Sequence, residues 1–228
     1  MKTLLSLFDY TGNWARPFAE SGWNVILWDI KHTTDLYSTF SDIQYACADY
    51  FHENIFDNYG TVDGIIAALP CTDFAGSGAR WWKEKDASGQ TAESIELAYQ
   101  TLRIIDLCKP DFWAVENPVG RLHKLVPEMG KPLMYFQPCD YGDPYTKKTA
   151  LYGDFNTDLE RNPVFPSEGS KMHRMYGGKS AKTKEMRSIT PEGFSKAFFQ
   201  ANRDYVTPNR EWEDEYWEEI KCEQLQLF

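Results

Sequence analysis

Short apolar runs, separated by segments with helical or turn character, restrict this chain to few kinds of fold. The runs at residues 4–8 and 64–69 have the length and apolar content of strands buried on both faces. Between residues 94 and 108, apolar side chains recur near the spacing of a helix. Strands that alternate with helices predict an α/β protein with a mostly parallel sheet and helices on both faces. Further strands are predicted at residues 24–30, 45–49 and 112–115, and a further helix at residues 14–21.

The second half of the chain follows a different pattern. Residues 133–140 and 148–155 have the pattern of a closing pair of strands, whereas residues 156–188 are polar and irregular. Pro191 in a first turn predicts a helix over residues 189–202. We therefore expect a core at residues 1–155, a short basic loop region at residues 156–188, and a C-terminal helix with an acidic tail at residues 189–228.

Chemically reactive side chains follow several of the predicted strands. Parallel sheets bind ligands beyond the carboxyl ends of their strands, so these side chains are expected to meet at one edge. Cys71 lies just beyond the run at residues 64–69 rather than inside it, which makes it a candidate nucleophile. Taken alone, Cys71 is more simply a packed structural thiol, so its assignment depends on its neighbours. The residues at these strand ends are Asp9, Asp29, Asp49, Cys71 and Glu116.

Charge is distributed unevenly along the chain. The net charge of −10 argues against a protein that coats nucleic acid, because phosphate binding needs concentrated Lys and Arg. Residues 171–187 are nevertheless locally basic, and residues 211–223 are strongly acidic. Considered alone, the basic stretch is more simply a solvated surface loop.

The cysteines and the hydropathy indicate the compartment. The 5 cysteines are widely spaced and contain no Cys-x-x-Cys pair, which argues against a disulfide framework and a metal site. No apolar run reaches the roughly 18 residues of a membrane span, and Asp9 comes too early for a signal peptide. These features predict a cytoplasmic protein that uses neither membrane nor metal.

The first two predicted strands suggest a cofactor. A turn at residues 10–13 follows the first strand, and Asp29 ends the second, where an acid can bind ribose hydroxyls. Asp49 lies near the expected adenine position. Gly12 is alone in this turn, which disfavours hydride chemistry and leaves an S-adenosylmethionine pocket as the alternative.

Motifs in a fixed order resemble a known family. The stretches are Pro-Cys-Thr at residues 70–72, VENPVGRL at residues 115–122 and YGDPYTKKTALYG at residues 141–153. Together they resemble the cytosine-C5 DNA methyltransferases, specifically the short, often phage-borne type, over about residues 4–153. The stretch RSITPEGFSKAFFQAN at residues 187–202 looks like the C-terminal segment of that subgroup.

The resemblance implies a Rossmann-like methyltransferase that transfers a methyl group from S-adenosylmethionine to C5 of cytosine in DNA. Cys71 matches the family's nucleophile and Glu116 its catalytic glutamate, while Lys147 and Lys148 stand where a paired-arginine motif usually lies. Pro118 replaces the valine of the Glu-Asn-Val motif. The positions implied for the cofactor are Phe8, Tyr10, Gly12, Asn13, Trp14, Asp29, Ile30, Asp49, Tyr50 and Pro70.

A DNA substrate would have to be flipped out of its helix or be single-stranded. Glycines at residues 76 and 78 give the loop after Cys71 freedom to move, while Trp81 and Trp82 either fill a vacated base stack or pack on a helix. Residues 156–188 are too short for a target-recognition domain, so specificity is expected to be low, very short, or supplied by a partner protein or homodimer. Free dCMP and a non-catalytic cofactor- or DNA-binding role remain alternatives. The expected DNA contacts are Ser77, Arg80, Lys171, Arg174, Lys179, Lys182 and Lys184.

Overall fold

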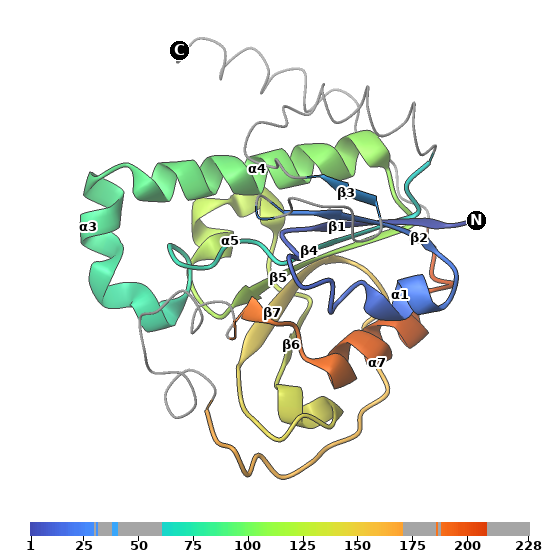
Figure 1. The fold of residues 1–228 in the computed structure, drawn as a ribbon. Coiled ribbons are helices and arrows are strands. Elements are labelled where there is room, and N and C mark those ends of the chain that lie inside the picture. The colour runs from blue at the N-terminus through green and yellow to red at the C-terminus, as the bar shows by residue number, and fades with distance from the viewer. Residues whose placement is uncertain (30, 32–37, 41–60, 171–185, 187, 209–228) are drawn as a thin grey trace.

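The computed structural model describes residues 1–29, 31, 38–40, 61–170, 186 and 188–208 (Figure 1). In this part of the chain, seven strands form one sheet in the order β3-β2-β1-β4-β5-β7-β6. The strands are β1 (Thr3–Leu7), β2 (Asn24–Trp28), β3 (Ser38–Phe40), β4 (Gly64–Ala67), β5 (Phe112–Pro118), β6 (Met134–Phe136) and β7 (Thr149–Asp154). The α-helices are α1 (Arg16–Glu20), α3 (Trp82–Ala87), α4 (Gln90–Cys108), α5 (Leu122–Leu125) and α7 (Glu192–Asn202), and the 3-10 helices are η1 (Gly76–Trp81), η2 (Pro127–Met129) and η3 (Pro138–Tyr141).

The pairing of the strands places their ends. Strands β3, β2, β1, β4 and β5 are all parallel, so their carboxyl ends lie at one edge of the sheet. β7 then runs antiparallel to β5, with Glu116 opposite Leu151 and Pro118 opposite Thr149. The residues just before β7 therefore return to the edge at which β5 ends.

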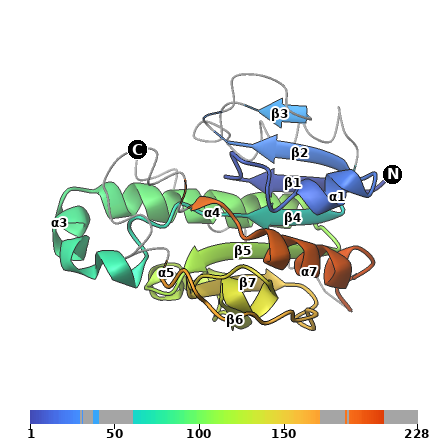
Figure 2. The same cartoon turned by 60° about the horizontal axis from the view of Figure 1, so that its bottom comes forward.

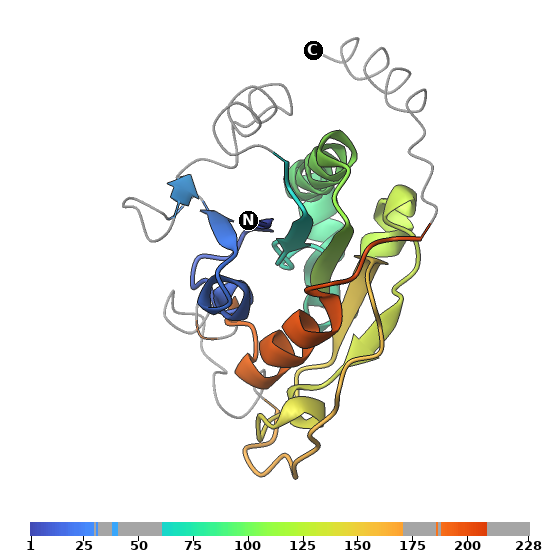
Figure 3. The same cartoon turned by 90° about the vertical axis from the view of Figure 1, so that its right-hand side faces the viewer.

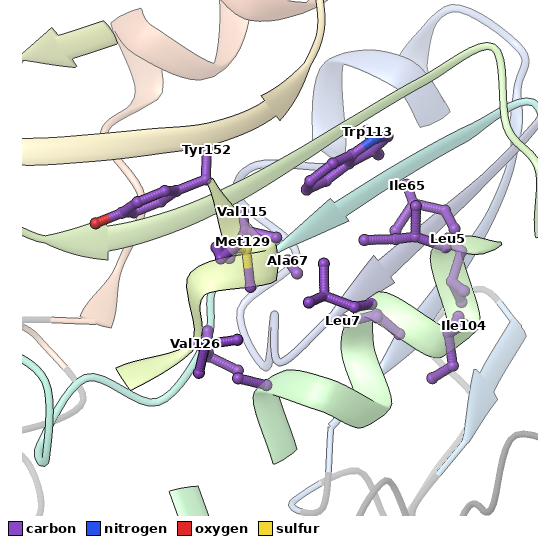
Figure 4. Close-up of a cluster of buried hydrophobic side chains, with 14 of the residues drawn as sticks. Leu5, Leu7, Ile65, Ala67, Ile104, Trp113, Val115, Val126, Met129 and Tyr152 are labelled. Carbon is purple, nitrogen blue, oxygen red and sulfur yellow. The ribbon is translucent and has the colours of Figure 1, made fainter. Parts of the chain in front are cut away.

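Helices cover both faces of the sheet, as the side view in Figure 3 shows. On one face, Ala98, Leu102 and Ile105 of α4 pack in a buried cluster with side chains from β1, β4 and β5. Figure 4 shows part of this cluster, including Leu5 and Trp113. Apolar burial of this kind contributes about 1.5–3 kcal/mol for each large side chain.

The opposite face is largely aromatic. Phe18 of α1 packs with Phe112 of β5 and Phe199 of α7, at ring-centroid distances of 6.0 and 4.9 Å. Phe194 and Phe198 of α7 are fully buried in the same cluster. The helix predicted near residue 190 is therefore part of the packing on this face, alongside α1 (Figure 2).

The predicted fold class, an α/β protein with a mostly parallel sheet and helices on both faces, is confirmed. β3 was not predicted, because Ser38–Phe40 is no apolar run and gains its strand conformation by pairing with β2. The strand predicted at residues 45–49 lies outside the described residues, as do the acidic tail from residue 209 and most of the basic loop region. Residues 76–87, expected to form a mobile loop in their first part, fold as η1 and α3.

Within the described residues, no helix is both long and apolar enough to cross a membrane. The same part of the chain contains no group of three His, Cys, Asp or Glu side chains placed to hold a metal ion.

Candidate active site

Cys71 lies just beyond the carboxyl end of β4, in a turn fixed by hydrogen bonds. Its carbonyl oxygen accepts from the backbone N–H groups of Phe74 and Ala75, at 3.2 and 2.9 Å. The fully buried Asn117 of β5 donates from Nδ2 to the carbonyl oxygen of Leu69 at 3.0 Å, which ties this turn to the neighbouring strand. Cys71 is half-buried and has no disulfide partner. Asn117 was not singled out from the sequence, although it follows Glu116 directly.

Glu116 and Lys147 form a buried ion pair beside this turn. Glu116 Oε1 lies 3.4 Å from Lys147 Nζ, and the two side chains are only 8% and 7% exposed. The antiparallel pairing of β5 with β7 brings the lysine to the glutamate. Gln137 Oε1 accepts the backbone N–H of Lys147 at 2.9 Å, which fixes the chain just before β7.

The thiol of Cys71 interacts with this ion pair. Burial raises the pKa of Cys71, the positive charge of Lys147 opposes that rise, and the negative charges of Glu116 and Asp73 add to it. The structure therefore brings together a nucleophile, an acid and a cation from the ends of β4 and β5 and the start of β7.

The structure separates the two adjacent lysines. Lys148 is exposed, and its Nζ lies over the ring of Tyr135 at 5.4 Å from the centroid. Successive side chains of an extended chain point to opposite sides, so only Lys147 reaches Glu116. This corrects the expectation that either lysine serves the site.

The turn after β1 is held against the end of β2. Phe8 N–H donates to the carbonyl oxygen of Trp28 at 2.7 Å. Phe8 and Gly12 have left-handed backbones, with φ of 59° and 65°, and this conformation is ordinary for glycine but strained for phenylalanine. Asp29 follows β2 and accepts the N–H of Lys31 at 2.9 Å, while Lys31 Nζ lies 5.1 Å from the ring centroid of Tyr10. Phe8, Tyr10, Gly12 and Asp29 thus gather at the ends of two adjacent strands.

Asp9 organises this turn from within. Its carboxylate accepts from Ser6 Oγ at 3.0 Å, and more weakly from Thr11 Oγ1 and the N–H of Ala15, both at 3.4 Å. Burial raises the pKa of Asp9, and these hydrogen bonds oppose the rise. The sequence marked Asp9 as a strand-end acid, but its role in ordering the turn depends on contacts that the sequence does not display.

Replacement of this buried acid should change the pH dependence of stability. A pKa raised by folding contributes stability below the unfolded-state value, and this contribution is lost as the pH rises through the folded-state value. We therefore expect Asp9→Asn to become more stable relative to the wild type as the pH rises from 4 to 8. The difference between their free energies of unfolding should change by about 1.4 kcal/mol for each unit by which folding raises the pKa of Asp9. Urea unfolding across this range measures the difference. The exposed Asp158→Asn is the matched control, and a pH-independent Asp9→Asn difference would contradict the prediction.

Trp14 requires a correction. Its side chain is fully buried and packs against Phe194 and Phe198 of α7, with ring centroids 5.8 and 5.4 Å apart. A residue without exposed surface cannot contact a cofactor, so Trp14 anchors the turn to the core instead.

The remaining predicted cofactor residues are placed in different ways. Asn13 is half-buried and accepts a hydrogen bond from Arg16 at 2.5 Å, and Pro70 is exposed beside Cys71. Ile30, Asp49 and Tyr50 lie outside the described residues.

Two of the predicted DNA contacts are placed on η1. Ser77 and Arg80 are exposed, and the Arg80 guanidinium lies 5.0 Å from the ring centroid of Trp81, which is 45% exposed. Trp82 is half-buried under Arg121. Of the two roles expected for it, it therefore has the packing role. Lys171, Arg174, Lys179, Lys182 and Lys184 fall outside the described residues.

The strand order and the helices on both faces of the sheet define a Rossmann-like fold. Residues 2–134 match the family model of the C-5 cytosine-specific DNA methylases. The chain belongs to this family, and the resemblance seen in its motifs is confirmed. No curated protein matches the chain.

One solved structure supports the fold. A prophage-encoded E. coli protein named as a DNA modification methyltransferase is similar at 18% identity and a TM-score of 0.51, over 76% of this chain and 55% of that one. A mutant of DNMT2 from Spodoptera frugiperda is similar at 17% identity and a TM-score of 0.41, over 75% of this chain and 54% of that one. The chain thus spans about half of the length of each of these structures.

Proposed function

We propose that this protein transfers a methyl group from S-adenosylmethionine to C5 of cytosine in DNA, through a covalent bond between Cys71 and C6 of the base. The observation that carries the proposal is the convergence of Cys71 with the buried pair of Glu116 and Lys147 at the carboxyl edge of the sheet. Family membership supports the same reaction.

The chemistry explains why these three groups are needed together. C5 of cytosine is too weak a nucleophile to accept a methyl group until a thiolate has added to C6. Cys71 supplies the thiolate, and the nearby charge of Lys147 stabilises it. As the S–C6 bond forms, electron density moves into the ring, so Glu116 must share a proton with N3 once the base is bound. Lys147 remains beside Glu116 and supports the polar edge of the base.

The remaining steps restore the enzyme. When bound, S-adenosylmethionine would supply an electrophilic methyl group to C5 and would leave as the neutral thioether. A base then removes the C5 proton, the C6–S bond breaks, the C5–C6 double bond reforms, the proton at N3 returns to Glu116, and Cys71 leaves as a thiolate. A water molecule is the proposed base.

The turn after β1 fits the proposed cofactor. Tyr10 is 39% exposed at the rim of the turn, and a half-buried carboxylate, Asp29, ends the neighbouring strand. An acid at this place accepts hydrogen bonds from ribose hydroxyls, as in other nucleoside-binding sheets. Phe8, Tyr10, Gly12 and Asn13 would line the cofactor, with Ile30, Asp49, Tyr50 and Pro70 completing the set that the family implies.

DNA is favoured over free dCMP by the surface beside Cys71. Arg80 stacked on the exposed Trp81 offers a phosphate contact and a base-stacking surface on the segment that follows the nucleophile. Ser77 and the basic residues between Lys171 and Lys184 would extend this contact, with a partner protein or second copy adding specificity. The net charge of −10 is the feature that keeps dCMP as an alternative.

Labelled S-adenosylmethionine with a panel of acceptors tests the proposal. The protein is incubated with cytosine-containing duplex, the single strand, dCMP and a duplex of only adenine and thymine, followed by nucleoside mass spectrometry. We expect 5-methylcytosine in DNA and none from the cytosine-free duplex. Label in dCMP alone would mean that the free nucleotide, and not DNA, is the substrate. Cofactor binding without transfer to any acceptor would favour a non-catalytic role.

A further inference from the structure

The segment that follows the nucleophile has little apolar core of its own. η1 and α3 contain no buried side chain, and they project beyond the end of the sheet beside α4 (Figures 1 and 2). Helices this short are not stable by themselves in water. Contacts from elsewhere in the chain must therefore fix the position of this segment.

One buried side chain, that of Arg121, supplies many of these contacts. Its Nε donates to the carbonyl oxygen of Asp73 at 2.9 Å, and its two terminal nitrogens donate to the two carboxylate oxygens of Asp86 at 2.8 and 2.6 Å. One of these nitrogens also donates to Thr91 Oγ1 at 3.1 Å, and the guanidinium lies 4.5 Å from the ring centroid of Trp82. Arg121 thus joins the loop after Cys71, α3 and the start of α4.

The backbone around Arg121 lies against the same loop. The N–H of Arg121 donates to the carbonyl oxygen of Phe74, and the N–H of Gly76 donates to that of Val119, both at 2.9 Å. A Cβ atom at Gly120 would lie 1.9 Å from the Phe74 oxygen, so only glycine permits this approach. Residues 119–121 and 74–76 are therefore held in one arrangement.

This arrangement reaches the nucleophile directly. The turn that Arg121 holds begins at Cys71, whose carbonyl oxygen accepts from Phe74 and Ala75. Asp73, two residues after Cys71, is also fixed by Lys85 at 2.8 Å and by Ser94 Oγ at 2.7 Å. A change at the Arg121 guanidinium therefore acts on a turn that Lys85, Ser94 and backbone hydrogen bonds also hold.

We infer that Arg121 is a positioning residue for Cys71, which it serves by holding the turn of residues 71–76 against α3 and α4. The importance of this position to catalysis rests on the proposed function, but the effect on Cys71 does not. The role requires arginine, because a planar fork can engage both Asp86 oxygens, the Asp73 carbonyl and the Trp82 ring together. Lysine keeps the charge but cannot make this set of contacts.

Alkylation of the free protein tests the inference without any substrate. Arg121→Lys, Asp86→Asn and the double variant are treated with iodoacetamide, and each cysteine is followed by peptide mass spectrometry. We expect Cys71 in Arg121→Lys to react at least about tenfold faster than in the wild type, because local opening exposes the half-buried thiol. The double variant should exceed Arg121→Lys by little, since both changes remove the same contact.

The buried Cys108 of α4 serves as an internal control, and the exposed Arg203→Lys as a matched arginine control. We expect the alkylation rate of Cys108 to be the same in every variant, and that of Cys71 to be the same in Arg203→Lys as in the wild type. An unaltered Cys71 rate in folded Arg121→Lys overturns the inference, and so does a parallel rise at Cys71 and Cys108, which reports general destabilisation. If DNA methylation is observed, kcat of Arg121→Lys should fall while KM for S-adenosylmethionine is retained. Absence of methylation with every acceptor would overturn the proposed function and leave the alkylation result standing.

Discussion

Cys71→Ser should lose at least about four orders of magnitude in methyl transfer to cytosine, because a hydroxyl at this position is a far weaker nucleophile than a thiolate. Binding of S-adenosylmethionine should be unchanged, since the proposed cofactor turn follows β1 rather than β4. Initial rates with labelled S-adenosylmethionine and DNA, together with calorimetric binding of the cofactor, measure the two effects.

A modified substrate reports the covalent bond itself. Fluorine at C5 of cytosine replaces the hydrogen that must be removed as a proton before the C6–S bond can break. The Cys71–C6 bond should therefore persist after methyl transfer, and the wild-type protein should remain attached to the DNA through the peptide that contains Cys71. Cys139→Ser is the matched control, because Cys139 is also a half-buried free thiol but lies in η3 rather than in this turn. Full turnover of Cys71→Ser, or an adduct on another cysteine, would exclude the covalent mechanism proposed here.

The same thiol should respond to pH in a defined direction. Because burial raises its pKa, Cys71 should be less reactive than an exposed thiol at neutral pH and should gain reactivity as the pH rises. The free protein is therefore held mainly as the thiol. The Cys71 thiol must therefore lose its proton before it attacks C6, so this deprotonation is part of the reaction.

Much of the fold could be predicted from the sequence because apolar burial dominates it. Residues 4–8, 64–69 and 112–115 lie in or next to the central strands of a parallel sheet, where both faces are covered and the sequence is nearly all apolar. Strand β3 lies at the edge and owes its conformation to a neighbour, so its own residues carried no such signal. The glycine-containing segment 76–81 was expected to be irregular, but it folds as η1, whose first residue, Gly76, donates to the carbonyl oxygen of Val119.

The site was predictable where position along a strand decides it. Cys71 follows β4 and Glu116 lies near the carboxyl end of the adjacent parallel strand β5, so one topological rule placed both at the same edge. The direction in which a side chain points was harder to predict from the sequence. Trp14 turns into the core, and Lys147 rather than Lys148 meets Glu116, because of pairings with α7 and β5 that involve residues far apart in the sequence.

Lys147→Met should be the most damaging change outside the nucleophile. It leaves the buried Glu116 without its cation, which typically costs about 3–5 kcal/mol in the free energy of unfolding. The backbone hydrogen bond from Lys147 to Gln137 and the strand pairing of β7 remain, so the loss reports the side chain. Methyl transfer should fall about 10²–10³-fold, as expected when one charge at a reacting group is removed. Urea unfolding and initial rates measure the two effects.

Lys148→Met is the matched control because it removes the same group from the next residue. Lys148 is exposed over Tyr135, so its replacement should change the free energy of unfolding by less than about 1 kcal/mol. Alkylation separates Lys147 from Arg121: loss of a charge that favours the thiolate should slow Cys71 in Lys147→Met, whereas loosening of its turn should accelerate it in Arg121→Lys. Equal effects of the two methionine variants would mean that the ion pair with Glu116 has no special part in the site. A slower Cys71 in Lys147→Met with an unchanged one in Lys148→Met would show that the lysine beside Glu116 also acts on the nucleophile.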